Sequence, residues 1–222
     1  MTTDEYILQH IDPEPEYLRR LYRATQVHLL RGRMASGHLQ GRLLKMMVQL
    51  SGARRVLEIG TFSGYATLCL AEGLPEGGVV HTFEINDEQE DFTRPWLEGR
   101  HERCGYPDEV FGRIHLHIGD ARDLLPEMHE VFDLAFIDGD KRQYSECYEM
   151  VMEHMRPGGL ILADNTLWDG HVLEDNPHER MTQGIQSFNN HIMNDPRVTR
   201  VMLPLRDGLT IIRVKDGNNK TE

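Results

Sequence analysis

The first fifty residues repeat apolar side chains at helical spacing. Residues 16–30 and 39–50 each place Leu, Val, Met or Tyr at every third or fourth position. This is the period of an amphipathic helix, in which one stripe of side chains faces a core. Gly32 and Gly37 lie between the two stripes. The pattern predicts two helices, at 16–30 and 39–50, within an N-terminal helical cap over residues 1–50.

From residue 54 onward, short apolar runs alternate with longer amphipathic stretches. The runs predict strands at 54–59, 78–84, 113–118, 132–137 and 158–163. The stretches predict helices at 62–72, 87–104 and 144–155. Strands that alternate with helices are joined by right-handed crossovers and pair mainly in parallel. The pattern therefore predicts an α/β fold with a mainly parallel sheet.

The C-terminal part has a different pattern. Residues 197–203 and 209–214 are rich in β-forming residues, and Asp207-Gly208 lies between them. Asp-Gly between two such runs is typical of a β-hairpin. Residues 216–222 are polar, and we predict a frayed tail there. A chain of 222 residues without repeats or a low-complexity linker is expected to form one domain over residues 1–222.

Charge and composition narrow the class of protein. The formal net charge of −12 disfavours nonspecific nucleic-acid binding. Apolar runs are too short to span a bilayer, and the acidic N-terminus lacks the features of a signal peptide. We therefore expect a soluble, cytoplasmic protein. The three cysteines form no CxxC pair, and the twelve histidines show no HExxH or other ligand spacing.

Acidic residues recur where the predicted strands end. Each of the five predicted strands of the parallel sheet has an acid at, just before or just after its carboxyl end: Glu58, Glu84, Asp120, Asp138 and Asp164. Ligands of open α/β sheets bind beyond these strand ends. A turn can carry an acid by chance, but recurrence on every strand indicates a shared site.

The first strand, turn and helix are typical of a site for a nucleoside. Gly60 and Gly64 allow a backbone to approach a ligand closely, although a turn that only packs a helix on a sheet is the alternative. The spacing matches neither GxGxxG nor a phosphate-binding Walker loop. Glu84 is placed to accept hydrogen bonds from ribose hydroxyls, unless it is a solvated strand end. Asp120 and Ala121 follow the next strand, where an adenine would lie.

A second group of residues has the chemistry of a metal site. Asp138, Asp164 and Asn165 offer oxygen atoms, which suit Mg²⁺, Mn²⁺ or Ca²⁺ better than zinc. A helix cap or a turn is the alternative interpretation of Asp164-Asn165. Lys141 follows Asp138 by three positions and is a candidate general base, unless it is an ordinary solvated lysine.

Five motifs in order resemble those of the cation-dependent O-methyltransferases, which include catechol and caffeoyl-CoA O-methyltransferases. The motifs are VLEIGTFSGYAT, FEIN, IGDA, FIDGDK and LADNTLWDG, and the resemblance extends from about Met34 to Val214. It implies a Rossmann-like class I methyltransferase fold with extra N-terminal helices. Such a fold has a seven-stranded, mostly parallel sheet with an antiparallel last strand and helices on both faces. Relatives of this type also lead us to expect a homodimer.

The resemblance also implies roles for individual residues. S-adenosylmethionine would be bound by Ser36, Glu58, Gly60, Thr61, Phe62, Gly64, Ala66, Glu84, Asp120, Ala121 and Asp138. Mg²⁺, or Mn²⁺ or Ca²⁺ in its place, would be bound by Asp138, Asp164 and Asn165. Lys141, together with Asp138, would be catalytic. The sequence departs from the family pattern at Val201, where the animal catechol enzymes have a glutamate. This departure concerns catechol as the substrate and leaves the expected reaction type unchanged.

The expected activity is therefore metal-dependent O-methylation of a catechol-type or vicinal-hydroxyl small molecule, including a CoA ester. Trp168 either stacks on an aromatic substrate or packs against the protein. One alternative activity is methylation of hydroxyuridine in tRNA, which basic residues in the N-terminal part favour, unless they form a solvated helix face: Arg19, Arg20, Arg23, Arg31 and Arg33. An NAD-dependent oxidoreductase and a non-catalytic nucleotide-binding protein are the further alternatives. The missing GxGxxG disfavours the first, and the intact metal-type residues disfavour the second.

Overall fold

The computed structural model describes residues 1–216, so the tail predicted at 216–222 lies outside the described residues after its first position. The chain forms two compact units. The first contains residues 1–54 and 61–119, and the second contains residues 55–60 and the residues from Asp120 on. The expectation of a single domain stays a prediction. Among residues 1–216, no helix combines the length and the apolar character that crossing a bilayer requires.

Seven strands form one mixed sheet in the order β3-β2-β1-β4-β5-β7-β6. Their bounds are β1 Arg55–Ile59, β2 Val79–Glu84, β3 Ile114–Ile118, β4 Phe132–Ile137, β5 Met155–Asp164, β6 Val198–Leu203 and β7 Leu209–Val214. The pairs β2·β3, β1·β4 and β4·β5 are parallel, whereas β7 is antiparallel to both β5 and β6. The predicted α/β fold, its C-terminal hairpin and its antiparallel last strand are confirmed.

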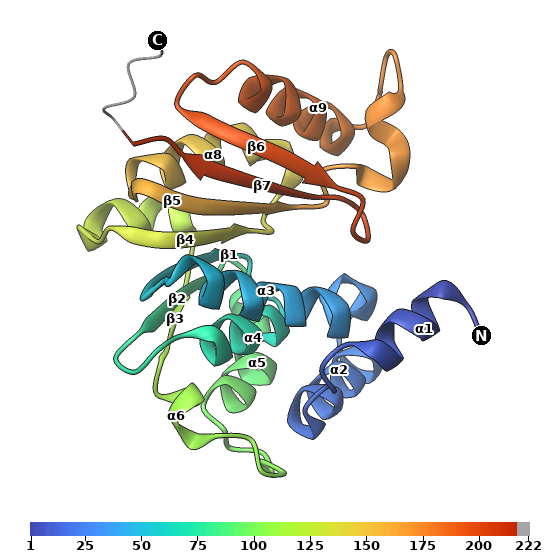
Figure 1. The fold of residues 1–222 in the computed structure, drawn as a ribbon, viewed down its shortest axis with the longest axis vertical. Coiled ribbons are helices and arrows are strands. Elements are labelled where there is room, and N and C mark those ends of the chain that lie inside the picture. Colours follow the sequence, from blue (N-terminus) through green and yellow to red (C-terminus); the bar gives the residue numbers. More distant parts are fainter. Residues whose placement is uncertain (217–222) are drawn as a thin grey trace. The chain divides into compact units, whose positions relative to one another are not determined.

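The first unit contains six α-helices among its described residues: α1 Thr3–His10, α2 Glu16–His28, α3 Gly37–Ser51, α4 Tyr65–Gly73, α5 Glu90–Leu97 and α6 Asp108–Phe111 (Figure 1). Tyr17 of α2 is fully buried, and its hydroxyl donates to the carbonyl of Trp96 in α5 at 2.7 Å. This core confirms the two helices predicted in the N-terminal cap. Helix α1 was not predicted because it has no buried residue and therefore no apolar stripe.

The long helix predicted over 87–104 is wrong in extent, because α5 ends at Leu97. Gly99 has a φ of +64°, and its N–H donates to the carbonyl of Trp96 at 3.2 Å. The N–H of Arg100 donates back to the carbonyl of Pro95 at 2.9 Å. This pair of bonds is the Schellman arrangement, in which a left-handed glycine ends a helix.

The helices of the second unit are α7 Ala121–Leu124, α8 Tyr144–Glu153 and α9 Arg180–Met193, with short 3-10 helices η3 Leu125–Met128, η4 Lys141–Gln143 and η5 Trp168–Leu173. Helix α9 was not predicted, although it buries Thr182, Ile185, Phe188 and Ile192 at helical spacing. The ring of Phe188 meets that of Tyr144 edge-on at 5.1 Å between centroids. A side chain at Gly184 would clash with the carbonyl of Lys141, so this glycine allows α9 to pack closely against η4.

Candidate active site

The proposed metal ligands lie at the ends of two neighbouring parallel strands. Ile137 of β4 pairs with Ala163 of β5, so Asp138, just past the end of β4, lies beside Asp164, the last residue of β5. Asp164 is buried, and its side chain accepts a hydrogen bond from the N–H of Asn165 at 2.9 Å. Asn165 has a φ of +56°, a conformation that asparagine tolerates better than most residues. The structure thus brings the three predicted ligands to one edge of the second unit.

Tyr144 ties these two strand ends together. Its fully buried hydroxyl lies 2.7 Å from the carbonyl oxygens of both Ile137 and Asp164, and it donates to one of them. Burial, and then the charges of Asp138 and Asp164, raise the pKa of Tyr144 well above its usual range, so it stays a neutral hydroxyl. The sequence analysis did not identify this residue, although it lies three positions after Lys141, which is one helical turn.

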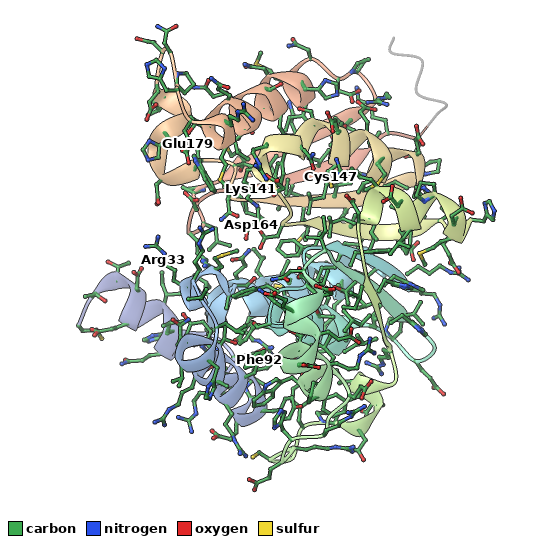
Figure 2. All side chains as sticks on the ribbon, turned by 180° about the vertical axis from the view of Figure 1, so that it is seen from behind. Arg33, Phe92, Lys141, Cys147, Asp164 and Glu179 are labelled. Atoms are coloured by element: carbon green, nitrogen blue, oxygen red, sulfur yellow. The ribbon has the colours of Figure 1, made fainter. Side chains whose placement is uncertain are left out.

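Lys141 is buried against the same group of residues. Its ammonium donates to Oδ1 of Asp138 at 2.7 Å and to the hydroxyl of Tyr144 at 3.1 Å. Only 8% of its side chain is exposed, so the alternative of a solvated lysine is wrong. Asp140 holds the start of η4 by accepting the N–H of Arg142 at 3.0 Å. Figure 2 shows Lys141 and Asp164 near each other in the second unit.

This group of residues fits a hard divalent cation. Its donors are carboxylate and amide oxygens, which Mg²⁺, Mn²⁺ and Ca²⁺ prefer. The carboxylate of Asp138 is partly buried and bonded to Lys141, and Asp164 beside it is almost wholly shielded from water. Oxygen donors gathered from two strand ends in this way can bind such a cation.

In the first unit, the turn after residue 60 is built around Glu84. The backbone N–H groups of Phe62 and Asn86 donate to its two carboxylate oxygens at 2.7 and 2.9 Å. Phe62 reaches this position with a φ of +48°. The hydroxyl of Thr61 lies 2.6 Å from that of Thr82 on β2. Glu84 is therefore a buried acceptor held by main-chain donors.

Both glycines of the first motif are required by close packing. A Cβ on Gly60, where φ is +101°, would lie 2.5 Å from the carbonyl oxygen of Asp138. A Cβ on Gly64, where φ is +84°, would lie 2.6 Å from Leu97. Between them, the buried hydroxyl of Ser63 has no hydrogen-bond partner among residues 1–216. A buried polar atom without a partner fits a turn that binds a polar ligand.

The other predicted cofactor residues have varied surroundings. Ser36 and Ala66 are buried in the first unit, and Glu58 and Ala121 are buried in the second. Asp120 caps α7, and its carboxylate is bound by the guanidinium of Arg122, whose hydrogen bonds lower the pKa of Asp120. Asp120 therefore has a structural partner, which the sequence did not indicate.

The segment 168–179 is held by hydrogen bonds. The indole of Trp168 donates to Glu179 at 3.4 Å, so this side chain has a protein partner. The side-chain amide of Gln186 on α9 donates to the carbonyls of Val172 and Glu174 at 3.1 and 2.8 Å. Val201, the position at which the sequence departs from the family pattern, lies exposed on β6.

Comparison with known proteins identifies the family. A model of the O-methyltransferase family matches residues 9–215. A caffeoyl-CoA O-methyltransferase of Zea mays is 33% identical over 208 residues, which cover 90% of this chain and 77% of the maize protein. A catechol O-methyltransferase of Niastella koreensis is 33% identical over 185 residues, which cover 79% of this chain and 80% of that protein.

A solved structure agrees with this match. The O-methyltransferase from Bacillus cereus, in complex with SAH, superimposes with a TM-score of 0.86 at 31% identity, over 96% of both chains. The agreement extends over nearly the whole fold, so it is not limited to the motifs. The chain belongs to the O-methyltransferase family, as its sequence motifs predicted.

Proposed function

We propose that the protein transfers the methyl group of S-adenosylmethionine to one of two adjacent hydroxyls of a small molecule, with the help of a divalent cation. Catechols and their CoA esters are the substrate class. The observation that carries this proposal is the pair of carboxylates at the ends of β4 and β5, with a buried lysine bonded to one of them.

Asp138, Asp164 and Asn165 are the residues that would hold the cation. Mg²⁺, when bound, would supply a Lewis acid and a template for two hydroxyl oxygens. Tyr144 keeps both aspartates in place through the carbonyls at the strand ends. The role of these residues is therefore to set the position of the substrate hydroxyl, on which methyl transfer depends strongly.

Lys141 would remove the proton from the hydroxyl that is methylated. Its ζ nitrogen donates to both Asp138 and Tyr144, so a neutral amine at this position would use both of its N–H groups there. The lone pair would then point in a third direction, where it can accept the proton. The new bond joins the hydroxyl oxygen to the methyl carbon while the bond from sulfur to that carbon breaks. The products are a methyl ether and S-adenosylhomocysteine.

Glu84 would bind the two ribose hydroxyls of the cofactor. Its carboxylate oxygens are oriented by the N–H groups of Phe62 and Asn86 and keep further acceptor capacity. Ser63 offers an additional polar group at the same turn. The remaining residues assigned to the cofactor by the motifs are proposed to line its binding site: Ser36, Glu58, Gly60, Thr61, Gly64, Ala66, Asp120 and Ala121.

The test is the formation of S-adenosylhomocysteine from S-adenosylmethionine with caffeic acid and other catechols. We expect product in the presence of Mg²⁺ and none after EDTA treatment. Restoration of activity by added Mg²⁺ would exclude damage by the chelator. Activity that persisted in EDTA would contradict the metal role, and failure to bind S-adenosylmethionine by calorimetry would contradict the whole proposal.

The tRNA alternative receives little support from the arginines. Arg19 pairs with Glu16, and Arg20 pairs with Glu102, both within 2.8 Å. These acids reduce the positive charge available to a phosphate backbone. The expectations of a homodimer and of a cytoplasmic location stay predictions, which light scattering and cell fractionation would test.

A further inference from the structure

Three histidines lie on one face of the β2–β3 pair in the first unit. His115 and His117 are two residues apart on β3, so their side chains point to the same face of the strand. His81 on β2 pairs with His115 in the parallel register and therefore lies on that face too. This group, called here the histidine cluster, depends on cross-strand pairing, so spacing along the sequence does not reveal it.

The rings of the histidine cluster are in direct contact. Nδ1 of His81 lies 3.0 Å from Nε2 of His117. The His81 ring stacks on the His115 ring at 4.8 Å between centroids, with an angle of 16° between their planes. On the other side, His117 stacks on Phe83 at 4.7 Å. Two of the three imidazoles thus already bring ring nitrogens together.

The cluster is open to a ligand from solution. β3 is the first strand in the sheet order and therefore an edge strand. His115 is exposed, whereas His81 and His117 are half-buried. The His115 ring would have to leave its stacked position and turn about its side-chain bonds to bring a third nitrogen toward the other two.

The chemistry of the cluster suits a borderline metal ion. Imidazole nitrogens bind Zn²⁺ at about 2.0–2.1 Å, which separates two ligands of a tetrahedral ion by roughly 3.3 Å. The His81–His117 separation of 3.0 Å is within a few tenths of an ångström of that value.

We propose that His81, His115 and His117 form a second metal site, which binds Zn²⁺ or a similar borderline ion such as Cu²⁺ or Ni²⁺. Nitrogen ligands distinguish this site from the oxygen ligands of Asp138, Asp164 and Asn165, which prefer Mg²⁺. A bound ion would join the edge strand β3 to β2. The proposal does not rest on the proposed methyltransferase mechanism.

Another group of potential ligands is less suitable. Ligand atoms of Glu149, His191 and Asp195 lie within 4.8 Å of one another. However, the guanidinium of Arg197 is 2.6 Å from both carboxylates. A fixed positive charge at this place opposes a metal ion. His191 is therefore a useful control, since it belongs to a histidine-containing group that we do not expect to bind zinc.

The experiment is calorimetric titration of the whole protein with Zn²⁺ in millimolar Mg²⁺, which keeps the oxygen site occupied. We expect one zinc ion per chain for the unaltered protein and for His191→Ala. His115→Ala and His117→Ala should each weaken zinc binding at least tenfold. Because His115 is exposed, its replacement is not expected to disturb folding, and circular dichroism checks this.

Two further measurements make the result decisive. Zinc should raise the Tm of the unaltered protein but not that of the His115→Ala/His117→Ala double variant. The electron paramagnetic resonance spectrum of bound Cu²⁺ should show coupling to imidazole nitrogen, which the double variant loses. Absence of zinc binding by the unaltered protein, or equal binding by the double variant, would overturn the proposal.

Discussion

Glu84 and Asp138 are both carboxylates at the carboxyl ends of parallel strands, but their partners differ. Glu84 ends β2 and accepts two main-chain N–H groups, which are neutral donors. Asp138 follows β4 and accepts the ammonium of Lys141, which is a charged donor that can exchange a proton. Two carboxylates at equivalent places in the sheet thus have different hydrogen-bond donors and suit different roles.

The difference follows from how each carboxylate is held. Main-chain donors are fixed by the fold, so Glu84 is oriented to accept uncharged groups such as hydroxyls. Asp138 is bonded to the ammonium of Lys141, and Asp164 lies beside it at the end of the next strand, so oxygen donors that suit a cation are gathered there. The comparison predicts that changes near Asp138 alter the rate of the reaction, whereas changes at Glu84 alter cofactor affinity.

Replacement of Lys141 by Ala should have the largest effect. Loss of a positioned general base typically lowers turnover by about 10²- to 10⁴-fold. Cofactor affinity should stay within a factor of two or so, because Lys141 is not among its proposed ligands. Steady-state kinetics and calorimetry with S-adenosylhomocysteine measure the two quantities. Lys45→Ala, which removes a lysine paired with Glu72, is the matched control. Equal losses of turnover in the two variants would contradict the role of Lys141 as the base.

Tyr144→Phe, which also changes the surroundings of Asp138, should have a smaller effect than Lys141→Ala. The change removes the hydroxyl that contacts Lys141 and the two strand-end carbonyls but keeps the ring. Partners of this kind, one step away from a metal, usually contribute about 10- to 100-fold to activity or metal affinity. Titration of activity with Mg²⁺ should show a higher activation constant.

Tyr148→Phe is the control for this experiment, since Tyr148 lies one helical turn further on and donates to Asp195 instead. It should leave the Mg²⁺ dependence unchanged. If both tyrosine variants shifted the Mg²⁺ activation constant equally, Tyr144 would have only a general structural role.

Glu84→Gln should weaken cofactor binding rather than slow the reaction. A hydrogen bond to a charged acceptor is worth about 1 kcal/mol more than one to a neutral acceptor, which corresponds to roughly a fivefold loss of affinity. We expect the KM for S-adenosylmethionine to rise by about this factor, with kcat at saturation nearly unchanged. Glu88→Gln, on the exposed turn after β2, is the control. A fall in kcat without a change in KM would contradict the assignment of Glu84.

The parts of the fold that could be predicted are those in which burial follows a regular pattern along the sequence. Strands β1, β2, β4 and β5 are apolar runs with an acid at, just before or just past the carboxyl end, so the sheet and these acids were both predictable. Glycine at 99 was visible in the sequence, but its left-handed conformation, which ends α5, was not. The buried positions of helix α9, in contrast, follow helical spacing that is visible in the sequence.

Features that depend on contacts between distant residues were not predictable. Tyr144, at the start of α8, matters because its hydroxyl reaches the carbonyl of Asp164, twenty residues away at the end of β5. His81 and His117 meet only because β2 and β3 pair in one particular register. Register and side-chain direction are properties of the folded chain.

Asp195 is a third carboxylate, which is paired within the protein and has no proposed role in the reaction. Asp195 is tightly paired, but its partner is Arg197 in its own turn, and no ligand is proposed there. The hydrogen bonds from Arg197 lower the pKa of Asp195 from 3.8 to about 2. A lowered pKa in the folded state stabilises the fold above pH 3.8, and this contribution is lost as the pH falls through about 2.

Asp195→Asn should therefore reduce stability without reducing turnover. The pKa shift corresponds to at most about 2 kcal/mol of unfolding free energy at pH 7, because water partly screens the half-exposed guanidinium of Arg197. Urea unfolding of the two proteins should show this difference near neutral pH, and the difference should shrink between pH 4 and pH 2. A loss of turnover as large as that of Tyr144→Phe would mean that tight pairing alone, rather than position at the ends of β4 and β5, determines which carboxylates matter for catalysis.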